Sequence, residues 1–306
     1  MPESGNRPSL NKEELDREIE EIVKIGKLAG ERISDFMQSG EPFILHAGTG
    51  LPGAAALKAY LQGLSWGKVP PFLSVTDFLY GTLPYAEEKL KVVFFMGSAR
   101  ERNLAVSLIS GLEVMNADFI IVTPLPEDPI LRERASSESF VSVSGTPDPV
   151  LTEIIASSFA GLSYAEKRGL REDMRIYRLR NELASLNEVY TQLLYERCGE
   201  LADLVSQAVD IDVVYTPFLQ SSAFSLYYKF LGLGKKVRIN DSDSTLPFVE
   251  ALSSTVLLFT SVEEASLREL LLRLQKGKKI AKLLRFNTDP LSALIYASFF
   301  SRCFAQ

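Results

Sequence analysis

The stretch ILHAGTGLPGAA, residues Ile44–Ala55, decides the fold of this chain. A short apolar run enters a loop that carries Gly48, Gly50 and Gly53, and the chain leaves the loop through alanines into AALKAYLQGL. This order is typical of a strand, a glycine-rich turn and a helix start, which together direct backbone N–H groups and a helix dipole at an anion. The stretch therefore predicts an α/β unit with a candidate phosphate-binding loop.

Apolar runs alternate with helical patterns along the rest of the chain. Before the loop, LNKEELDREIEEIVKIGKLAGERISDFM has apolar residues every three or four positions, which predicts an N-terminal helix. The predicted strands that follow the loop are PPFLSVTDFL, KLKVVFFMGSA, ADFIIVTPLP and SFVSVSG. Helical patterns such as NLAVSLISGLEVMN lie between them, and this alternation indicates a parallel sheet covered on both faces.

The same alternation resumes in the second half of the chain. It runs from VDIDVVYTPFL to DPLSALIYASFFSRCFAQ, after a long helical stretch. We predict residues 1–40 as a tail and helix, 41–170 as a first domain, 171–207 as a helical connector and 208–306 as a second domain. The predicted fold class is α/β, with two three-layer domains whose parallel sheets are flanked by helices, plus the N-terminal helix.

The composition of the 306-residue chain is that of a soluble globular protein, with 46% hydrophobic and 24% charged residues. Because no block rich in lysine and arginine offsets the net charge of −6, we expect no nucleic-acid partner. No apolar run reaches the roughly 18 residues that a membrane span requires. The polar start MPESGNRPSLNKEELDREIEE lacks the pattern of a signal peptide, so we expect a cytoplasmic protein with no membrane partner.

The first loop, HAGTGLPG, is open to more than one interpretation. A dinucleotide site would need an acidic residue at the end of the second strand, and Asp77 matches that position poorly. A Walker-type loop is excluded because no GK[ST] follows the glycines. Two alternatives remain, an anion site at Gly48, Thr49, Gly50 and Gly53, or a tight turn in which the glycines only permit close packing.

The second loop, MGSARERN, follows the third predicted strand. Gly97 and Ser98 offer backbone N–H groups and a hydroxyl, and Arg100 and Arg102 offer guanidinium groups to a phosphate. Alternatively, the two arginines form an exposed first helical turn and pair with nearby acids such as Glu101. Arginine in a first turn opposes the helix dipole, so an anion nearby would help explain these residues.

Few residues carry signals of catalysis or metal binding. The single histidine, His46, is either a general base or a structural residue, and the lack of an acid partner in sequence favours the structural role. Cys198 and Cys303 lie far apart without metal-ligand spacing, which indicates a reducing compartment. No Ser/His/Asp pattern and no clustered metal ligands occur, so we predict neither a metal nor a cofactor.

The order of elements and these two loops resemble the sugar isomerase (SIS) family, and more closely the archaeal-type bifunctional phosphoglucose/phosphomannose isomerases built from two such domains. The family's first loop, SGxGGSG, is matched by AGTGLPG at Ala47–Gly53, and its SYSGNTxET loop falls on FMGSARERN at Phe95–Asn103. VTDFL is similar to the family's second strand, and DPLSALIYASFFSRCFAQ resembles its last helix. The resemblance implies two SIS-like domains and a phosphosugar site at Gly48, Thr49, Gly50, Gly53, Gly97, Ser98 and Arg100.

The family's functional side chains are replaced in this chain. A serine of the first loop falls on Pro52, and Arg100 stands near the threonine of the second loop. The family's glutamate falls on Leu231 and Gly232, and its histidine falls around Thr245 and Leu246. The family's C-terminal lysine would lie beyond Gln306, so none of the three has a counterpart here. An aldose–ketose isomerase needs a ring-opening group and a base that moves a proton between adjacent carbons.

The resemblance therefore implies a protein that binds a sugar phosphate or related small anion and whose glucose/mannose-6-phosphate isomerase activity is weak or lost. No catalytic residue is assigned. Two alternatives stay open: an active isomerase with a relocated site that uses His46 or Glu250, and a non-catalytic structural or regulatory subunit. FSLYYKFLGLG and LIYASFFSRCF are richer in aromatic residues than a solvated surface tolerates, so we expect a homodimer.

Overall fold

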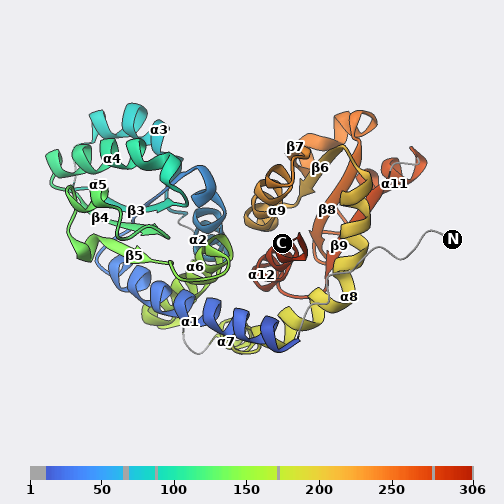
Figure 1. Cartoon of the computed structure of the whole chain (residues 1–306), viewed down its shortest axis with the longest axis horizontal. Helices are drawn as coiled ribbons and strands as arrows, with labels where there is room; N and C mark the ends of the chain where they lie inside the picture. Colours follow the sequence, from blue (N-terminus) through green and yellow to red (C-terminus); the bar gives the residue numbers. More distant parts are fainter. Residues whose placement is uncertain (1–11, 65–68, 87–88, 171–172, 278–279, 305–306) are drawn as a thin grey trace. The chain divides into compact units, whose positions relative to one another are not determined.

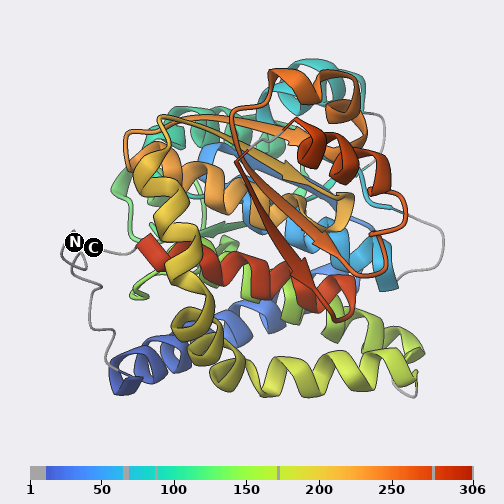
Figure 2. The same ribbon diagram turned by 90° about the vertical axis from the view of Figure 1, so that its right-hand side faces the viewer.

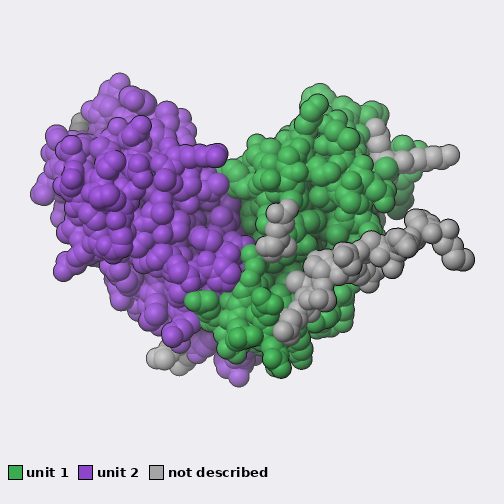
Figure 3. Space-filling view, viewed as in Figure 1, with its two compact units in different colours: residues 1–21, 184–306 green, residues 22–183 purple. Residues whose placement is uncertain are grey.

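The computed structural model describes residues 12–64, 69–86, 89–170, 173–277 and 280–304 of the chain. They fall into two compact units: unit 2 is Ile22–Leu183, and unit 1 combines Met1–Glu21 with Ala184–Gln306 (Figure 3). Each unit holds one parallel sheet flanked by helices, which confirms the predicted fold class (Figure 1). The predicted N-terminal helix is α1 (Lys12–Met37), and the tail expected before it lies outside the described residues.

The sheet of unit 2 has five parallel strands in the order β2-β1-β3-β4-β5. They are β1 (Phe43–Ala47), β2 (Phe72–Ser74), β3 (Lys91–Met96), β4 (Asp118–Thr123) and β5 (Phe140–Ser142). β3 is buried along its whole length because both faces of the sheet are covered. This explains why KVVFFM is continuously apolar rather than alternating.

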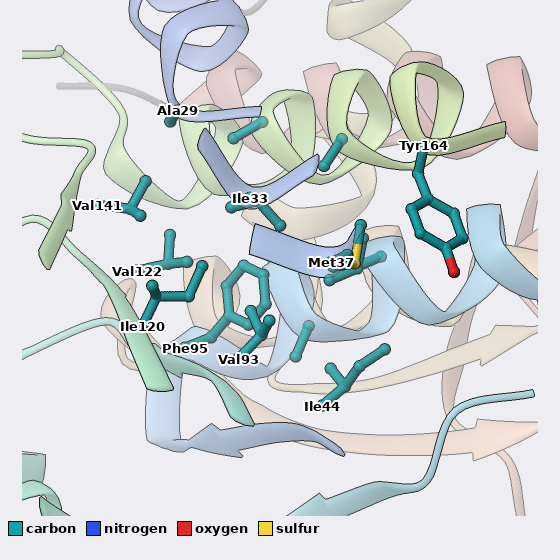
Figure 4. Close-up of a cluster of buried hydrophobic side chains, with 14 of the residues drawn as sticks. Ala29, Ile33, Met37, Ile44, Val93, Phe95, Ile120, Val122, Val141 and Tyr164 are labelled. Carbon is teal, nitrogen blue, oxygen red and sulfur yellow. The ribbon is translucent and has the colours of Figure 1, made fainter. Parts of the chain in front are cut away.

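Helices cover both faces of this sheet. They are α1, α2 (Leu51–Leu64), α3 (Val75–Asp77), α4 (Arg102–Val114), α5 (Pro129–Arg132) and α6 (Pro149–Ala165). α7 (Met174–Ala184) follows them and ends at the unit boundary. Val93 and Phe95 of β3 pack in one core cluster with α1, α2 and α6 (Figure 4). Phe94 and its neighbours on the opposite side pack with α3, α4 and α5.

The sheet of unit 1 has four parallel strands in the order β7-β6-β8-β9, seen in orange in Figure 2. They are β6 (Asp210–Tyr215), β7 (Lys236–Asp241), β8 (Ser254–Thr260) and β9 (Ala281–Phe286). The helices are α8 (Leu186–Gln207), α9 (Gln220–Gly232), α10 (Ser242–Thr245), α11 (Arg268–Lys276) and α12 (Pro290–Phe299). α9 packs on α12. Leu270 and Leu274 of α11, with Leu267 just before it, form a separate apolar cluster with β6 and β8.

The two cysteines are joined in a way that the sequence analysis did not predict. Cys198 of α8 forms a disulfide with Cys303 of the short helix η9 (Phe300–Phe304). The two residues are 105 positions apart, so their proximity depends on the packing of α8 against η9, which the sequence does not reveal. The disulfide removes the reason for expecting a reducing compartment, and a cytoplasmic location stays a prediction.

Within the ranges that the structure describes, no helix has both the length and the apolar composition needed to cross a bilayer.

Candidate functional site

The two predicted loops lie against each other at the carboxyl ends of β1 and β3 in unit 2. The short helix η1 (Gly48–Gly50) follows β1 and leads directly into α2. A Cβ atom added at Gly50 would overlap the backbone carbonyl of Phe95, and one added at Gly97 would overlap Thr49. Only glycine permits this approach, so the strands bring together most of the predicted residues. We call Gly48, Thr49, Gly50, Gly53, Gly97 and Ser98 the glycine cradle.

Ser98 begins the short helix η4 (Ala99–Glu101) that follows Gly97. Its hydroxyl Oγ accepts a hydrogen bond from the Arg100 amide at 3.3 Å and donates one to Oε2 of Glu101 at 2.5 Å. The cradle therefore keeps a hydroxyl in the place where the sequence analysis predicts one.

The two arginines of the second loop have different surroundings. Arg100 is exposed, so its side chain is next to the cradle in sequence but is not enclosed by it. Arg102 forms an ion pair with Asp128 at 2.6 Å, and the Asp128 side chain is only 5% exposed. Of the two alternatives for these arginines, pairing with an acid describes Arg102, whereas anion contact by Arg100 stays a prediction.

Glu101 lies against the glycine cradle, whereas the sequence suggested it only as a pairing partner for the arginines. Its side chain is 9% exposed, and a Cβ added at Gly48 would overlap its Oε1 atom. Gly48 also has a φ of +47°, in the left-handed region that favours glycine. The carboxylate therefore lies directly over Gly48. Ser98 followed three residues later by Glu101 is the capping-box pattern, a signal that could have predicted the contact between these two side chains but not the position over Gly48.

Glu153 is a second acid beside the cradle, and the sequence analysis missed it. It lies on α6, is 0% exposed, and has no hydrogen-bond partner for either carboxyl oxygen. A Cβ added at Gly53 would lie 3.0 Å from its Oε2, so the carboxyl group is directly beside the cradle. Burial raises its pKa well above the usual value, and the charges of Asp148 and Glu101 raise it further. Burial therefore favours the neutral form of this carboxyl group, and the sequence shows it only as a lone acid in an apolar helix.

His46 lies on β1, just before the cradle. Its ring lies 5.0 Å from that of Phe72, and burial lowers its pKa to about 4, an effect that Asp77 partly opposes. A group with this pKa accepts protons poorly at neutral pH, so the geometry supports the structural role over the general base. Glu250, the other candidate for a relocated catalytic site, belongs to unit 1, whereas His46 belongs to unit 2.

The corresponding strand ends of unit 1 are arranged around another glutamate. Glu263 follows β8, and its Oε2 accepts hydrogen bonds from the Thr260 amide at 3.1 Å and the Thr260 hydroxyl at 2.6 Å. A third comes at 2.7 Å from the hydroxyl of Thr216, which directly follows β6. Thr245, near the family's histidine position, donates its hydroxyl hydrogen to the Asp241 carbonyl.

Comparison with known proteins supports the fold. No protein-family model and no curated protein sequence matches the chain. A candidate phosphosugar isomerase from Bacillus subtilis is similar in structure, with 12% identity, 92% of each chain covered and a TM-score of 0.68.

Two further solved structures have named activities. The C-terminal domain of glucosamine-fructose-6-phosphate aminotransferase from Francisella tularensis is 12% identical, with 99% of this chain and 97% of that chain covered and a TM-score of 0.66. Tagatose-6-phosphate ketose/aldose isomerase from Escherichia coli is 13% identical, with 95% and 89% covered and a TM-score of 0.60. The chain therefore has the two-sheet SIS fold seen in these phosphosugar proteins.

Proposed function

We propose that this protein binds a sugar phosphate or related anion in the glycine cradle of unit 2 and does not turn it over as an isomerase. The observation that carries the proposal is the meeting of Gly50 and Gly97 at the N-terminus of α2. Backbone N–H groups and the helix dipole at such a terminus attract anions, and ligands of open parallel sheets bind at the carboxyl ends of the strands. Ser98 adds a hydroxyl donor.

The titratable groups beside the cradle are poorly suited to isomerisation. Glu153 is fully buried with a raised pKa, and burial lowers the pKa of His46 to about 4. The Glu101 carboxylate is held by the Ser98 hydroxyl. An aldose–ketose isomerase needs an accessible group whose pKa is matched to the proton that it moves, and general acid–base groups each contribute about 10²–10⁴-fold to the rate.

Two measurements on the purified full chain test this proposal. With fructose 6-phosphate, glucose 6-phosphate and mannose 6-phosphate as substrates, we expect turnover below about one-thousandth of that of an active phosphosugar isomerase assayed in parallel. With the same compounds as ligands, a concentration of 100 times the Kd should raise the unfolding free energy by about 2.7 kcal/mol. Robust turnover would favour the active-isomerase alternative, and absent binding would favour the non-catalytic subunit.

We also propose that the chain forms a homodimer through α9. Of the two aromatic residues of α12, Phe299 is buried inside unit 1 and Tyr296 is half-buried, so the fold of that unit accounts for much of this composition. Phe224, Tyr227 and Tyr228 of α9 instead form a partly exposed ring cluster with Tyr215. Light scattering should give twice the chain mass of 34.0 kDa, and a monomer at micromolar concentration would contradict the proposal.

A further inference from the structure

The glycine cradle already holds an anionic group, and that group belongs to the chain itself. Oε2 of Glu101 accepts the hydrogen bond of the Ser98 hydroxyl, and Oε1 lies over Gly48. These are the hydroxyl and the glycine loop that the proposed ligand phosphate would contact. A carboxylate next to the N-terminus of α2 is stabilised by the same helix dipole that attracts a phosphate.

A second, independent feature marks the cradle as more than a helix end. The side chain of Glu153 is fully buried next to Gly53, and neither carboxyl oxygen has a hydrogen-bond partner. Burying an unsatisfied polar group destabilises a fold. A buried carboxyl group without a partner next to the cradle does not stabilise the fold. We therefore take it as a sign that the residues around it serve a ligand.

We propose that Glu101 is an internal competitor for the ligand, and that a phosphate group enters the cradle only by displacing the Glu101 carboxylate. This inference rests on the proposed function, because it concerns the same site and the same ligand. In the free protein Glu101 satisfies the Ser98 hydroxyl and occupies the space over Gly48. In the complex the ligand phosphate takes both contacts, and the Glu101 side chain turns toward solvent.

The geometry allows this exchange without refolding. Glu101 ends the short helix η4, and the other two residues of that helix, Ala99 and Arg100, are exposed to solvent. The glutamate side chain can therefore leave the cradle by rotation about its own bonds while the backbone of η4 stays in place. If the carboxylate stayed, it would lie against a phosphate that carries the same sign of charge, which opposes binding.

Removing the charge of Glu101 should therefore strengthen phosphate binding. The variant Glu101→Gln keeps the shape of the side chain and an oxygen that accepts from Ser98, but it does not repel an anion. We expect isothermal titration with inorganic phosphate and with glucose 6-phosphate to give at least a tenfold lower Kd for this variant than for the wild type. Glu113→Gln, an exposed position on α4 of the same unit, makes the same change in net charge and should leave both Kd values unchanged.

The variant Glu101→Ser provides a second test, because it empties the space over Gly48 as well as removing the charge. Thermal unfolding of each variant shows whether it is folded. Equal Kd values for wild type and both folded Glu101 variants would overturn the inference while leaving the proposed function intact. Binding in the Glu101 variants alone would support the inference and show that the wild type does not take these ligands. No binding by any variant would overturn both proposals.

Discussion

The two units use the same local pattern at the same place in their sheets. In unit 2, Ser98 and Glu101 follow β3, the strand next to β1. In unit 1, Thr260 is the last residue of β8, the strand next to β6, and Glu263 lies three residues later. In both, a hydroxyl residue donates a hydrogen bond to a glutamate three positions later. The opposite loop differs: unit 2 presents Gly48, whereas unit 1 presents a threonine.

This difference distinguishes the two carboxylates. We propose that Glu263 holds its loops together, whereas Glu101 can be displaced by a ligand. In unit 1 the Thr216 hydroxyl donates to Glu263, so the loop after β6 is tied to the loop after β8 by side chains. In unit 2 the corresponding loop has no side chain at Gly48, and a Cβ there would collide with Glu101. An external group could therefore take the place of the Glu101 carboxylate over this glycine. This difference is why we propose the ligand site in unit 2.

The largest expected effect concerns the disulfide, which occurs in unit 1 only. In the chain-entropy description, a crosslink that closes a loop of 105 residues stabilises by about 4.7 kcal/mol. Replacing Cys198 and Cys303 with serine should lower the unfolding free energy of unit 1 by about that amount in urea titrations. The wild type treated with dithiothreitol is the matched control and should unfold like the variant. A wild-type midpoint that dithiothreitol does not move would contradict the structural role of the crosslink.

The next largest effect concerns ligand binding by unit 2. If Arg100 contacts the bound anion, Arg100→Ala should weaken glucose 6-phosphate binding by about 1.5–3 kcal/mol, the range for a charge-assisted hydrogen bond. Titration calorimetry measures this change directly. Arg134→Ala, at another exposed arginine of unit 2, should leave the affinity unchanged. Equal affinities for wild type and Arg100→Ala would remove this arginine from the site.

The glutamate of unit 1 should matter for stability and not for ligand binding. Glu263→Ala removes the acceptor of the Thr260 amide and of the Thr216 hydroxyl, in residues that are 0% and 1% exposed. Leaving such donors unsatisfied should cost about 1–3 kcal/mol of unfolding free energy, measured by urea titration. Asp243→Ala, at an exposed acid of the same unit, is the control. Tighter phosphate binding by Glu263→Ala would erase the distinction between the two units.

The smallest effect follows from the pKa of Glu153. Because burial raises this pKa in the folded state, the folded chain holds the proton to a higher pH than the unfolded chain does. The resulting stability is fully present below 4.5, the ordinary pKa of a glutamate, and is lost as pH rises through the raised pKa of the folded state. Relative to Glu153→Gln, the wild type should lose up to about 1.4 kcal/mol per pH unit in that window. Parallel pH curves for the two proteins would contradict the raised pKa.

The sequence was sufficient to predict the architecture because its signals are local. Apolar runs such as KVVFFM mark strands buried on both faces. The loops after β1 and β3 could be placed together because parallel strands end on the same side of a sheet. Gly50 and Gly97 accordingly approach each other, whereas the binding role of these loops stays a prediction.

The remaining features of the site depend on contacts between distant residues. Arg102 pairs with Asp128, 26 positions away, and Cys198 bonds to Cys303, so neither partner is visible in a local pattern. The inward turn of Glu101 depends on which residue of the opposite loop leaves space for it. The raised pKa of Glu153 depends on the depth of α6 in the core, which a single acidic residue in the sequence does not indicate.

The most direct test of this account is a crystal structure of the full chain with glucose 6-phosphate, determined alongside the ligand-free protein. We predict that the phosphate lies beside Gly97 and Ser98 in unit 2, and that the Glu101 carboxylate is over Gly48 only in the ligand-free crystal. We also predict that Glu263 keeps its hydrogen bonds to Thr216 and Thr260 in both crystals. A phosphate bound at the Glu263 site, or bound in unit 2 while Glu101 remains over Gly48, would contradict the account.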